Sequence, residues 1–217
     1  TLGTTFQPDF VWIKNRSNAY SHNLYDSVRG SGSARDLQTD TTNSEATNAT
    51  NAALYGYLSA FNSNGFTTTN GTDATSPGIW VNQNAQTFVA WQWRASNASA
   101  VTNTSGTISS QVSANQTAGF SIVTYTGNGI STATVGHGLG IQPAMVILKS
   151  RSLVNNWWVA HKGIPNSWLQ LETTGAAGTG GGAGGAINYQ STFTSSVFGF
   201  LNGSSNVNNV NQNAATY

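Results

Sequence analysis

Carboxylates are the first residues to consider, because two of them facing one glycosidic bond can hydrolyse it. Glu45 and Glu172 are the only glutamates, and they belong to different copies of the internal repeat described below. Asp9 and Asp26 are isolated. The sequence therefore offers no catalytic pair, and we expect the protein not to be an enzyme.

Histidines could bind a metal ion, but their spacing does not match a ligand set. His22, His137 and His161 are far apart, and the chain has no cysteine to join them. Residues 136–140 form a glycine-rich run, yet neither a lysine nor a helix follows it to hold a phosphate. We expect no metal ion and no cofactor.

Neighbouring tryptophans offer a different chemistry. Trp157 and Trp158 would point to opposite sides of a strand, so only one of them could enter a core. The other could contact a neighbouring subunit or stack on a sugar ring, with His161 further along the same strand. Core or subunit contact is the main interpretation, and a carbohydrate platform is the alternative. Trp91 and Trp93 share one face of a predicted strand, where we expect core packing.

The elements that must position these residues are strands. Charged residues make up only 7 % of the chain, and Asn, Ser, Thr and Gly take their place. Long helices normally carry Glu, Lys and Arg on their wet faces, whereas Thr, Val and aromatic residues favour strands. We predict an all-β protein built from antiparallel β-sandwiches, jelly-roll or concanavalin-like. Helix-like spacing occurs only within residues 49–61.

Composition also excludes several classes of partner. The net charge is +1 and no basic stripe is present, so nucleic-acid binding is not expected. No apolar run approaches the roughly 18 residues of a membrane span. The sequence starts without Met and shows no signal peptide, which suggests an excerpt or a processed product. Without cysteine, stability must come from burial and assembly.

The chain repeats itself. Residues 6–17 match residues 141–152, with Gln, Pro, Lys, Arg and Ser at the same relative places and an offset of 135 between Gln7 and Gln142. Four further matches follow in the same order: 28–30 with 161–163, 37–42 with 169–174, 65–66 with 199–200, and 82–88 with 211–217. Chance similarity between Asn-rich segments could explain one match but not five in order.

The repeat predicts two tandem domains. We assign residues 1–94 to the first β-sandwich and residues 118–217 to the second. The polar tract 95–117 between them is predicted to be an exposed linker.

The two copies differ at their ends. A strand predicted at 89–93 in the first copy has no counterpart after Tyr217, and the strand predicted at 120–125 has none before the first copy. We expect neighbouring chains to complete the domains or to cover their exposed edges, because an open sheet edge is a liability. This predicts a homo-oligomer.

Three segments leave alternatives open. Residues 10–13 and 144–148 are apolar at consecutive positions, which predicts strands with both faces covered. The cover could be the other copy or another subunit, and a local loop is the alternative. Residues 175–185 are nearly all Gly and Ala, which favours a long loop at a domain tip, with a close-packed contact as the other interpretation.

The motif Phe6-Gln7-Pro8-Asp9-Phe10-Val11-Trp12-Ile13-Lys14-Asn15-Arg16-Ser17 carries a family resemblance. Together with 25–30, 82–84 and 88–91, it resembles a family of uncharacterised tandem domains in structural proteins of bacteriophages, often marine and cyanobacterial phages. Segments of the second copy look like the same family: 120–129, 137–140 and 157–158.

The resemblance implies a non-enzymatic virion protein, such as a tail fibre, a tail appendage or a head decoration. Its partners would be other copies of itself or other virion proteins, and no catalytic residue carries over. A lectin-like adhesion module that binds host-surface glycans is the alternative. A charge-poor surface rich in Asn, Thr, Tyr and Trp suits either role.

Overall fold

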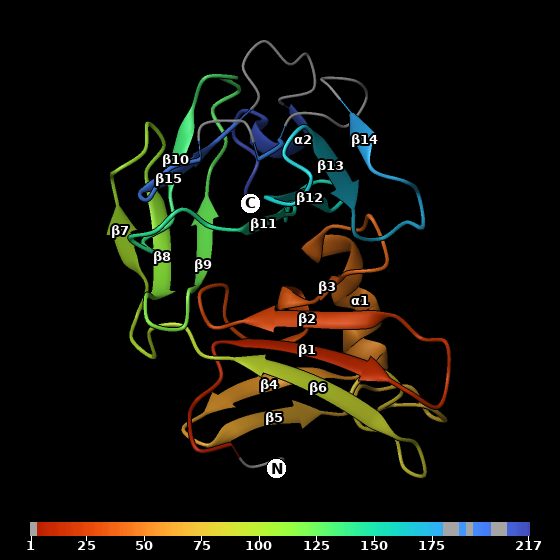
Figure 1. The fold of residues 1–217 in the computed structure, drawn as a ribbon. Coiled ribbons are helices and arrows are strands. Elements are labelled where there is room, and N and C mark those ends of the chain that lie inside the picture. The colour runs from red at the N-terminus through yellow and green to blue at the C-terminus, as the bar shows by residue number, and fades with distance from the viewer. Residues whose placement is uncertain (1–3, 180–186, 190–192, 201–207) are drawn as a thin grey trace. The chain divides into compact units, whose positions relative to one another are not determined.

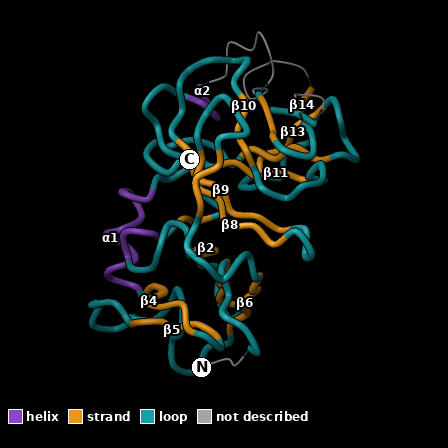
Figure 2. Tube along the Cα trace, turned by 90° about the vertical axis from the view of Figure 1, so that its left-hand side faces the viewer, coloured by secondary structure: helices purple, strands orange, loops and turns teal. Residues whose placement is uncertain are grey.

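The computed structural model describes residues 4–179, 187–189, 193–200 and 208–217. Strands account for 35 % of the protein and helices for 8 %, so the predicted all-β fold is confirmed. The chain divides into two compact units, Thr1–Ala98 and Ser99–Tyr217 (Figure 1). Figure 2 shows how little of the trace is helical, with α1 and α2 in purple. No helix among the described residues is long and apolar enough to cross a membrane.

The first unit contains two antiparallel sheets, a 3₁₀ helix and an α-helix. The larger sheet has the order β3-β2-β1-β6, and β4 pairs with β5 in a hairpin (Figure 1). The elements of the first unit are β1 (Phe10–Asn15), β2 (His22–Asp26), the 3₁₀ helix η1 (Ser33–Arg35), β3 (Leu37–Gln38), α1 (Glu45–Tyr55), β4 (Tyr57–Asn62), β5 (Gly65–Thr69) and β6 (Phe88–Trp93).

The core of the first unit is built on the inner face of β1. Val11 and Ile13 are buried there against Leu58 and Trp80, whereas Phe10 and Trp12 point outward and are partly exposed. Strand β1 therefore buries one face, as alternation along a strand dictates. Within the unit the outer face of residues 10–13 is covered in part, by the aromatic residues of β6; further cover by the other copy or another subunit stays a prediction.

Helix α1 begins and ends at identifiable caps. The Ser44 side chain accepts a hydrogen bond from Thr47 N at 3.3 Å, which satisfies one of the free N–H groups of the first turn. Gly56 ends the helix with a φ of 100°, a conformation that favours glycine. The predicted helical stretch 49–61 is thus helical only up to Tyr55, and strand β4 follows Gly56.

The second unit contains three sheets, with the orders β7-β8-β9, β10-β15 and β11-β12-β13-β14. Its elements are β7 (Val101–Asn103), β8 (Ser110–Asn115), β9 (Phe120–Tyr125), β10 (Thr134–Gly136), β11 (Met145–Leu148), β12 (Trp158–His161), β13 (Ser167–Gln170), β14 (Gly178–Thr179), β15 (Val197–Gly199) and α2 (Asn208–Asn211). The core contains Tyr125, Val135, Trp158 and Phe198.

The predicted linker at 95–117 is wrong, because this tract forms part of the second unit. Strand β8 pairs with β9 along its whole length, and β7 pairs with β8. Ile108 and Val112 are buried, so the tract also supplies apolar residues to the interior. Its many Ser, Thr and Asn residues concealed a strand with sparse apolar positions.

Two further predictions for the second unit can be compared with the structure. Within 144–148, Met145 and Ile147 are exposed in the single chain, and their cover by the other copy or another subunit stays a prediction. In the glycine-rich run 175–185, Gly178 and Thr179 form β14 on β13. Residues 180–185 of that run lie outside the described residues.

The strand register agrees with the match of residues 6–17 with 141–152 and not with that of 28–30 with 161–163, because it places Asp26, and not residue 28, at the counterpart position of His161. In the first unit Phe10 pairs with Asp26, and in the second Met145 pairs with His161. These partners are related by the same offset as residues 6–17 and 141–152. The next pairing also repeats: Leu24 with Leu37, and Val159 with Leu169. The three strands β1-β2-β3 and β11-β12-β13 are therefore counterparts.

Candidate functional site

The tryptophans predicted as a glycan or subunit contact are buried. Trp157 is 4 % exposed and Trp158 is 1 % exposed. Trp158 packs edge-on against Trp168, with ring centroids 5.1 Å apart. Trp157 lies just before β12, so the alternation of side chains along that strand does not force one of the two rings outward. The main-chain N–H of Trp157 donates to Glu172 Oε2 at 3.1 Å. The main interpretation, core packing, holds for Trp158, and the expectation that only one of the two rings could be buried is wrong; the alternative, a carbohydrate platform, does not fit the burial of these rings.

His161, the third predicted residue, ends strand β12 and is partly exposed. Its Nδ1 accepts a hydrogen bond from Gly163 N at 3.0 Å in the following turn. The histidine therefore organises a local turn, and the buried indoles of Trp157 and Trp158 offer it no exposed aromatic partner.

An exposed aromatic surface lies instead on the sheet of the first unit. Trp91 is 45 % exposed and Trp93 is 39 % exposed. The pairing of β6 with β1 sets Trp91 opposite Trp12 and Trp93 opposite Phe10. Since Phe10 and Trp12 lie on the outer face of β1, the two tryptophans of β6 lie there too. The prediction that Trp91 and Trp93 pack in the core is wrong.

We name Phe10, Trp12, Trp91 and Trp93 the aromatic face. Phe10 and Trp93 are packed edge-on at 5.3 Å between ring centroids, and Trp12 and Trp91 are tilted at 5.7 Å. Such aromatic pairs stabilise one another and hold the rings in fixed orientations. One signal in the sequence could have located this surface. Lys14 lies two residues after Trp12 and four after Phe10, so the three side chains point to the same face of β1, and a lysine marks that face as the solvent-exposed one.

A shallow hollow continues the aromatic face at Trp91. Its lining includes Lys14, Tyr20, His22 and Asp40. Asp40 Oδ1 accepts a hydrogen bond from His22 N at 3.0 Å. Burial lowers the pKa of His22, against the opposing charge of Asp40. The hollow thus combines an exposed indole with a cation, a carboxylate and an imidazole.

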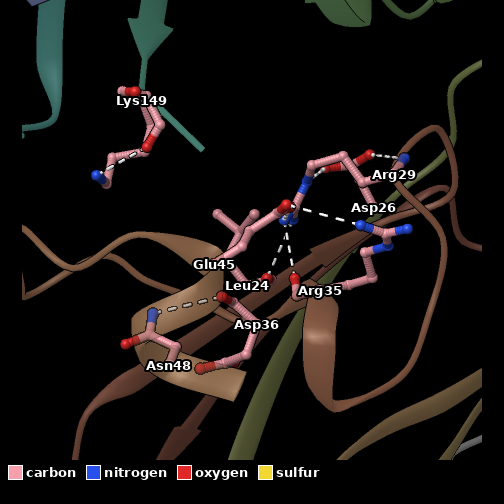
Figure 3. Close-up of polar contacts among 9 residues, drawn as sticks. Leu24, Asp26, Arg29, Arg35, Asp36, Glu45, Asn48 and Lys149 are labelled. Atoms are coloured by element: carbon pink, nitrogen blue, oxygen red, sulfur yellow. Dashed lines mark hydrogen bonds and ion pairs between the residues drawn. The ribbon is translucent and has the colours of Figure 1, made fainter. Parts of the chain in front are cut away.

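Two acids of the first unit, Asp26 and Glu45, bind the same arginine (Figure 3). Arg29 Nη1 donates to Glu45 Oε1 at 2.7 Å, and Arg29 N donates to Asp26 Oδ1 at 2.9 Å. The guanidinium also donates to the carbonyl oxygens of Arg35 and Leu24. Burial alone would lower the pKa of Arg29, but the charges of Asp26 and Glu45 raise it overall.

This ion cluster ties β2 to the start of α1, and its carboxylates are occupied. Asp26 is 5 % exposed and Glu45 is 7 % exposed. A buried carboxylate held by a guanidinium is not available to transfer a proton to a bound molecule. The cluster therefore has the geometry of a structural element.

A third acid, Asp36, is fully buried beside the cluster. Its Oδ1 accepts from Asn23 Nδ2 at 2.9 Å. Its carbonyl oxygen accepts from Asn48 Nδ2 at 3.3 Å (Figure 3). Burial raises the pKa of Asp36 to about 6, although the hydrogen bond from Asn23 opposes the shift. Asp36 is 0 % exposed, so it cannot touch a molecule in solution.

The described residues contain no group of three or more His, Cys, Asp or Glu that could hold a metal ion. The surface with the clearest capacity for a ligand is therefore the aromatic face with its polar hollow. It offers ring faces and hydrogen-bonding groups, which suit recognition.

Comparison with known proteins adds one relationship. No curated protein and no solved structure matches the chain. One family profile matches residues 1–217, so it spans both compact units. The chain therefore belongs to the family described as a domain of unknown function, DUF7483.

Proposed function

We propose that the chain is a non-enzymatic structural module of a bacteriophage virion, in a tail fibre, a tail appendage or a head decoration. In this role the aromatic face binds a neighbouring virion protein, either another copy of the chain or a different component. The observation that carries the proposal is the exposure of Trp91 and Trp93, at 45 % and 39 %, on one face of a four-stranded sheet.

Exposed aromatic clusters support a binding role on general grounds. Contiguous apolar patches are uncommon on monomeric proteins and mark interaction sites. Tryptophan is also enriched among the residues that contribute most to protein interfaces. The rings of Phe10 and Trp12 pack against those of Trp93 and Trp91 on the neighbouring strand, so a partner would meet a preorganised surface that costs little ordering.

Three carboxylates of the first unit are not available to a bound molecule. Asp26 and Glu45 are bound to Arg29, and Asp36 is fully buried. The sequence resemblance to phage structural proteins is the reason for assigning the chain to a virion. The charge-poor composition suits a surface that contacts other proteins.

The proposal is tested on particles and on the purified chain. Immunogold labelling of phage particles from the source culture should place the chain at one fixed location, and its absence from intact particles would overturn the virion role. For a partner that is another copy of the chain, we expect the unmodified chain to self-associate in sedimentation velocity and the double variant Trp91→Ala/Trp93→Ala to stay monomeric. Val154→Ala is the matched control, since Val154 is 64 % exposed in the other unit.

A lectin-like role is the second candidate, favoured by the hollow beside Trp91. A sugar ring could stack on the indole while its hydroxyl groups bond to His22 and Asp40. A glycan array would decide, with Trp91→Ala as the test variant and Val154→Ala as the control. Binding that only Trp91→Ala removes supports the lectin, and no binding by the unmodified chain overturns it.

A further inference from the structure

The hollow beside Trp91 is large enough for a small ligand. Its volume is about 950 Å³, which lies within the range of sites that bind small molecules. The strand register places Lys14 of β1 between Val89 of β6 and His22 of β2, so the hollow lies across three strands of one sheet. Side chains on paired strands hold their positions better than side chains on loops, so this floor has a fixed shape.

The charges in the hollow are unequal. Lys14 and Arg16 are cationic and Asp40 is anionic. His22 adds no charge near pH 7, because burial lowers its pKa. One positive charge is therefore in excess, which favours an anionic ligand.

Arg16 is the cation of the hollow that is available to such a ligand. The ammonium group of Lys14 already donates to the carbonyl oxygens of Asn18 and Tyr20. The Arg16 side chain is exposed, and its guanidinium makes no hydrogen bond or ion pair within the part of the chain that the structure describes. A free guanidinium can bind a carboxylate through two parallel hydrogen bonds.

The acid of the hollow also has an oxygen to spare, as its counterpart in the second unit shows. In the repeat, Asp40 matches Glu172 and His22 matches Trp157. Asp40 Oδ1 accepts from His22 N at 3.0 Å. Glu172 Oε2 accepts from Trp157 N at 3.1 Å, and its other oxygen accepts from Asn156 Nδ2. Asp40 is exposed, and its second oxygen has no such partner among the described residues.

The hollow thus joins three features: the apolar ring of Trp91, a guanidinium and a carboxylate oxygen. A hexuronic acid carries the three complementary groups, because its ring face is apolar, its carboxylate pairs with a guanidinium and its hydroxyl groups donate hydrogen bonds. A neutral sugar would leave Arg16 unused. An acidic peptide would bring no row of hydroxyl donors to Asp40.

We propose that the hollow binds the uronic acid residues of an acidic polysaccharide. In this site Trp91 stacks on the sugar ring, Arg16 binds the sugar carboxylate, and Asp40 accepts hydrogen bonds from its hydroxyl groups. The inference rests on the lectin-like candidate above, and it adds the class of sugar and the residue that selects it.

Matched sugars isolate the contribution of the charge. The probes are immobilised oligosaccharides of galacturonic, glucuronic and mannuronic acid, each beside its methyl ester, which keeps the ring and its hydroxyl groups without the charge. In biolayer interferometry, the unmodified chain should bind at least one acid about three- to fivefold more tightly than its ester, as expected for an exposed ion pair. The variant Arg16→Gln should bind that acid and its ester equally, and Trp91→Ala should bind neither.

Arg151→Gln is the matched control. Arg151 takes the place of Arg16 in the second unit, so this variant loses the same charge and should keep the preference for the acid. Circular dichroism shows that each variant is folded.

The outcomes separate this inference from the lectin-like role. Equal affinity for acids and esters that Trp91→Ala removes would overturn the inference and leave the lectin-like role in place. A preference for the acid that persists in Arg16→Gln would also overturn it, because the charge would then be recognised elsewhere. Binding to none of these acids would overturn it as well, while neutral glycans tested beside them decide the lectin-like role separately.

Discussion

Lys14 and Lys149 make the same interaction in the two units. Each ammonium group donates hydrogen bonds to the main-chain carbonyl oxygens four and six residues later, and so closes the turn that follows its strand. The bonds are Lys14 Nζ to Asn18 O at 3.1 Å and to Tyr20 O at 2.7 Å, and Lys149 Nζ to Leu153 O at 3.4 Å and to Asn155 O at 2.9 Å. The repeated lysine is therefore a structural residue of the duplicated unit.

Replacing the buried lysine should destabilise the second unit. In Lys149→Met the carbonyl groups of the turn lose a charged donor, and hydrogen bonds to charged groups contribute about 1.5–3 kcal/mol. Urea unfolding should show a loss in this range. Lys162→Met is the control, because Lys162 is exposed. A midpoint for Lys149→Met equal to that of the control would contradict the structural role.

Removing the buried arginine should cost more than removing its exposed neighbour. Arg29→Gln leaves Asp26 and Glu45 without their guanidinium partner, and breaking a buried ion pair costs about 3–5 kcal/mol. Arg35 lies 3.8 Å from Glu45 with its side chain 43 % exposed, so Arg35→Gln should cost less than about 1 kcal/mol. Equal unfolding free energies for the two variants, measured in urea, would show that the cluster does not stabilise the first unit.

Asp36 should make the first unit less stable as pH rises from about 4 to above 6. Burial raises its pKa from 3.8 in the unfolded chain to about 6 in the folded one, so the folded state holds the proton more tightly. The associated stability is fully present below the unfolded pKa and is lost as pH rises through the folded pKa. Since one pKa unit corresponds to about 1.4 kcal/mol, the loss is about 3 kcal/mol.

The test compares unfolding free energies of the unmodified chain and Asp36→Asn across pH 4–8. Asparagine keeps an acceptor for Asn23 and carries no charge, so the difference should grow in favour of the variant as pH rises. Asp73→Asn is the control: hydrogen bonds from the Thr75 and Ser76 main chain lower the pKa of Asp73, which is the opposite direction. A constant difference between Asp36→Asn and the unmodified chain over this range would contradict the prediction.

The duplication could be predicted from the sequence because it rests on local motifs. The run around Lys14 recurs around Lys149 with its polar residues in place, and the strand register follows it. Whether the buried side chains at the matched positions are polar or aromatic in their contacts could not be predicted from the repeat. Asn23 hydrogen-bonds to Asp36 in the first unit, whereas the counterpart residues Trp158 and Trp168 pack as aromatic rings.

That replacement explains why the candidate site was misplaced. The packing of a side chain on a strand depends on the side chain opposite it on the neighbouring strand, and that partner comes from another part of the chain. Trp158 is buried because Trp168 faces it, and Trp91 is exposed because Trp12 holds it on the outer face. Residue type alone favoured the core for Trp91, which is exposed, and could not decide which of Trp157 and Trp158 enters the core.

The different surroundings of these two tryptophans lead to a final prediction. Trp158→Ala should lower the unfolding free energy by about 3–5 kcal/mol, because it opens a cavity in a packed core. Trp91→Ala removes a ring that is 45 % exposed and packs on Trp12, so its main loss is the aromatic contact, about 0.5–1.5 kcal/mol. Both variants are measured by thermal and urea unfolding. A larger loss for Trp91→Ala than for Trp158→Ala would mean that the indole of Trp91 serves the core, and the aromatic face would then lose its claim as a binding surface.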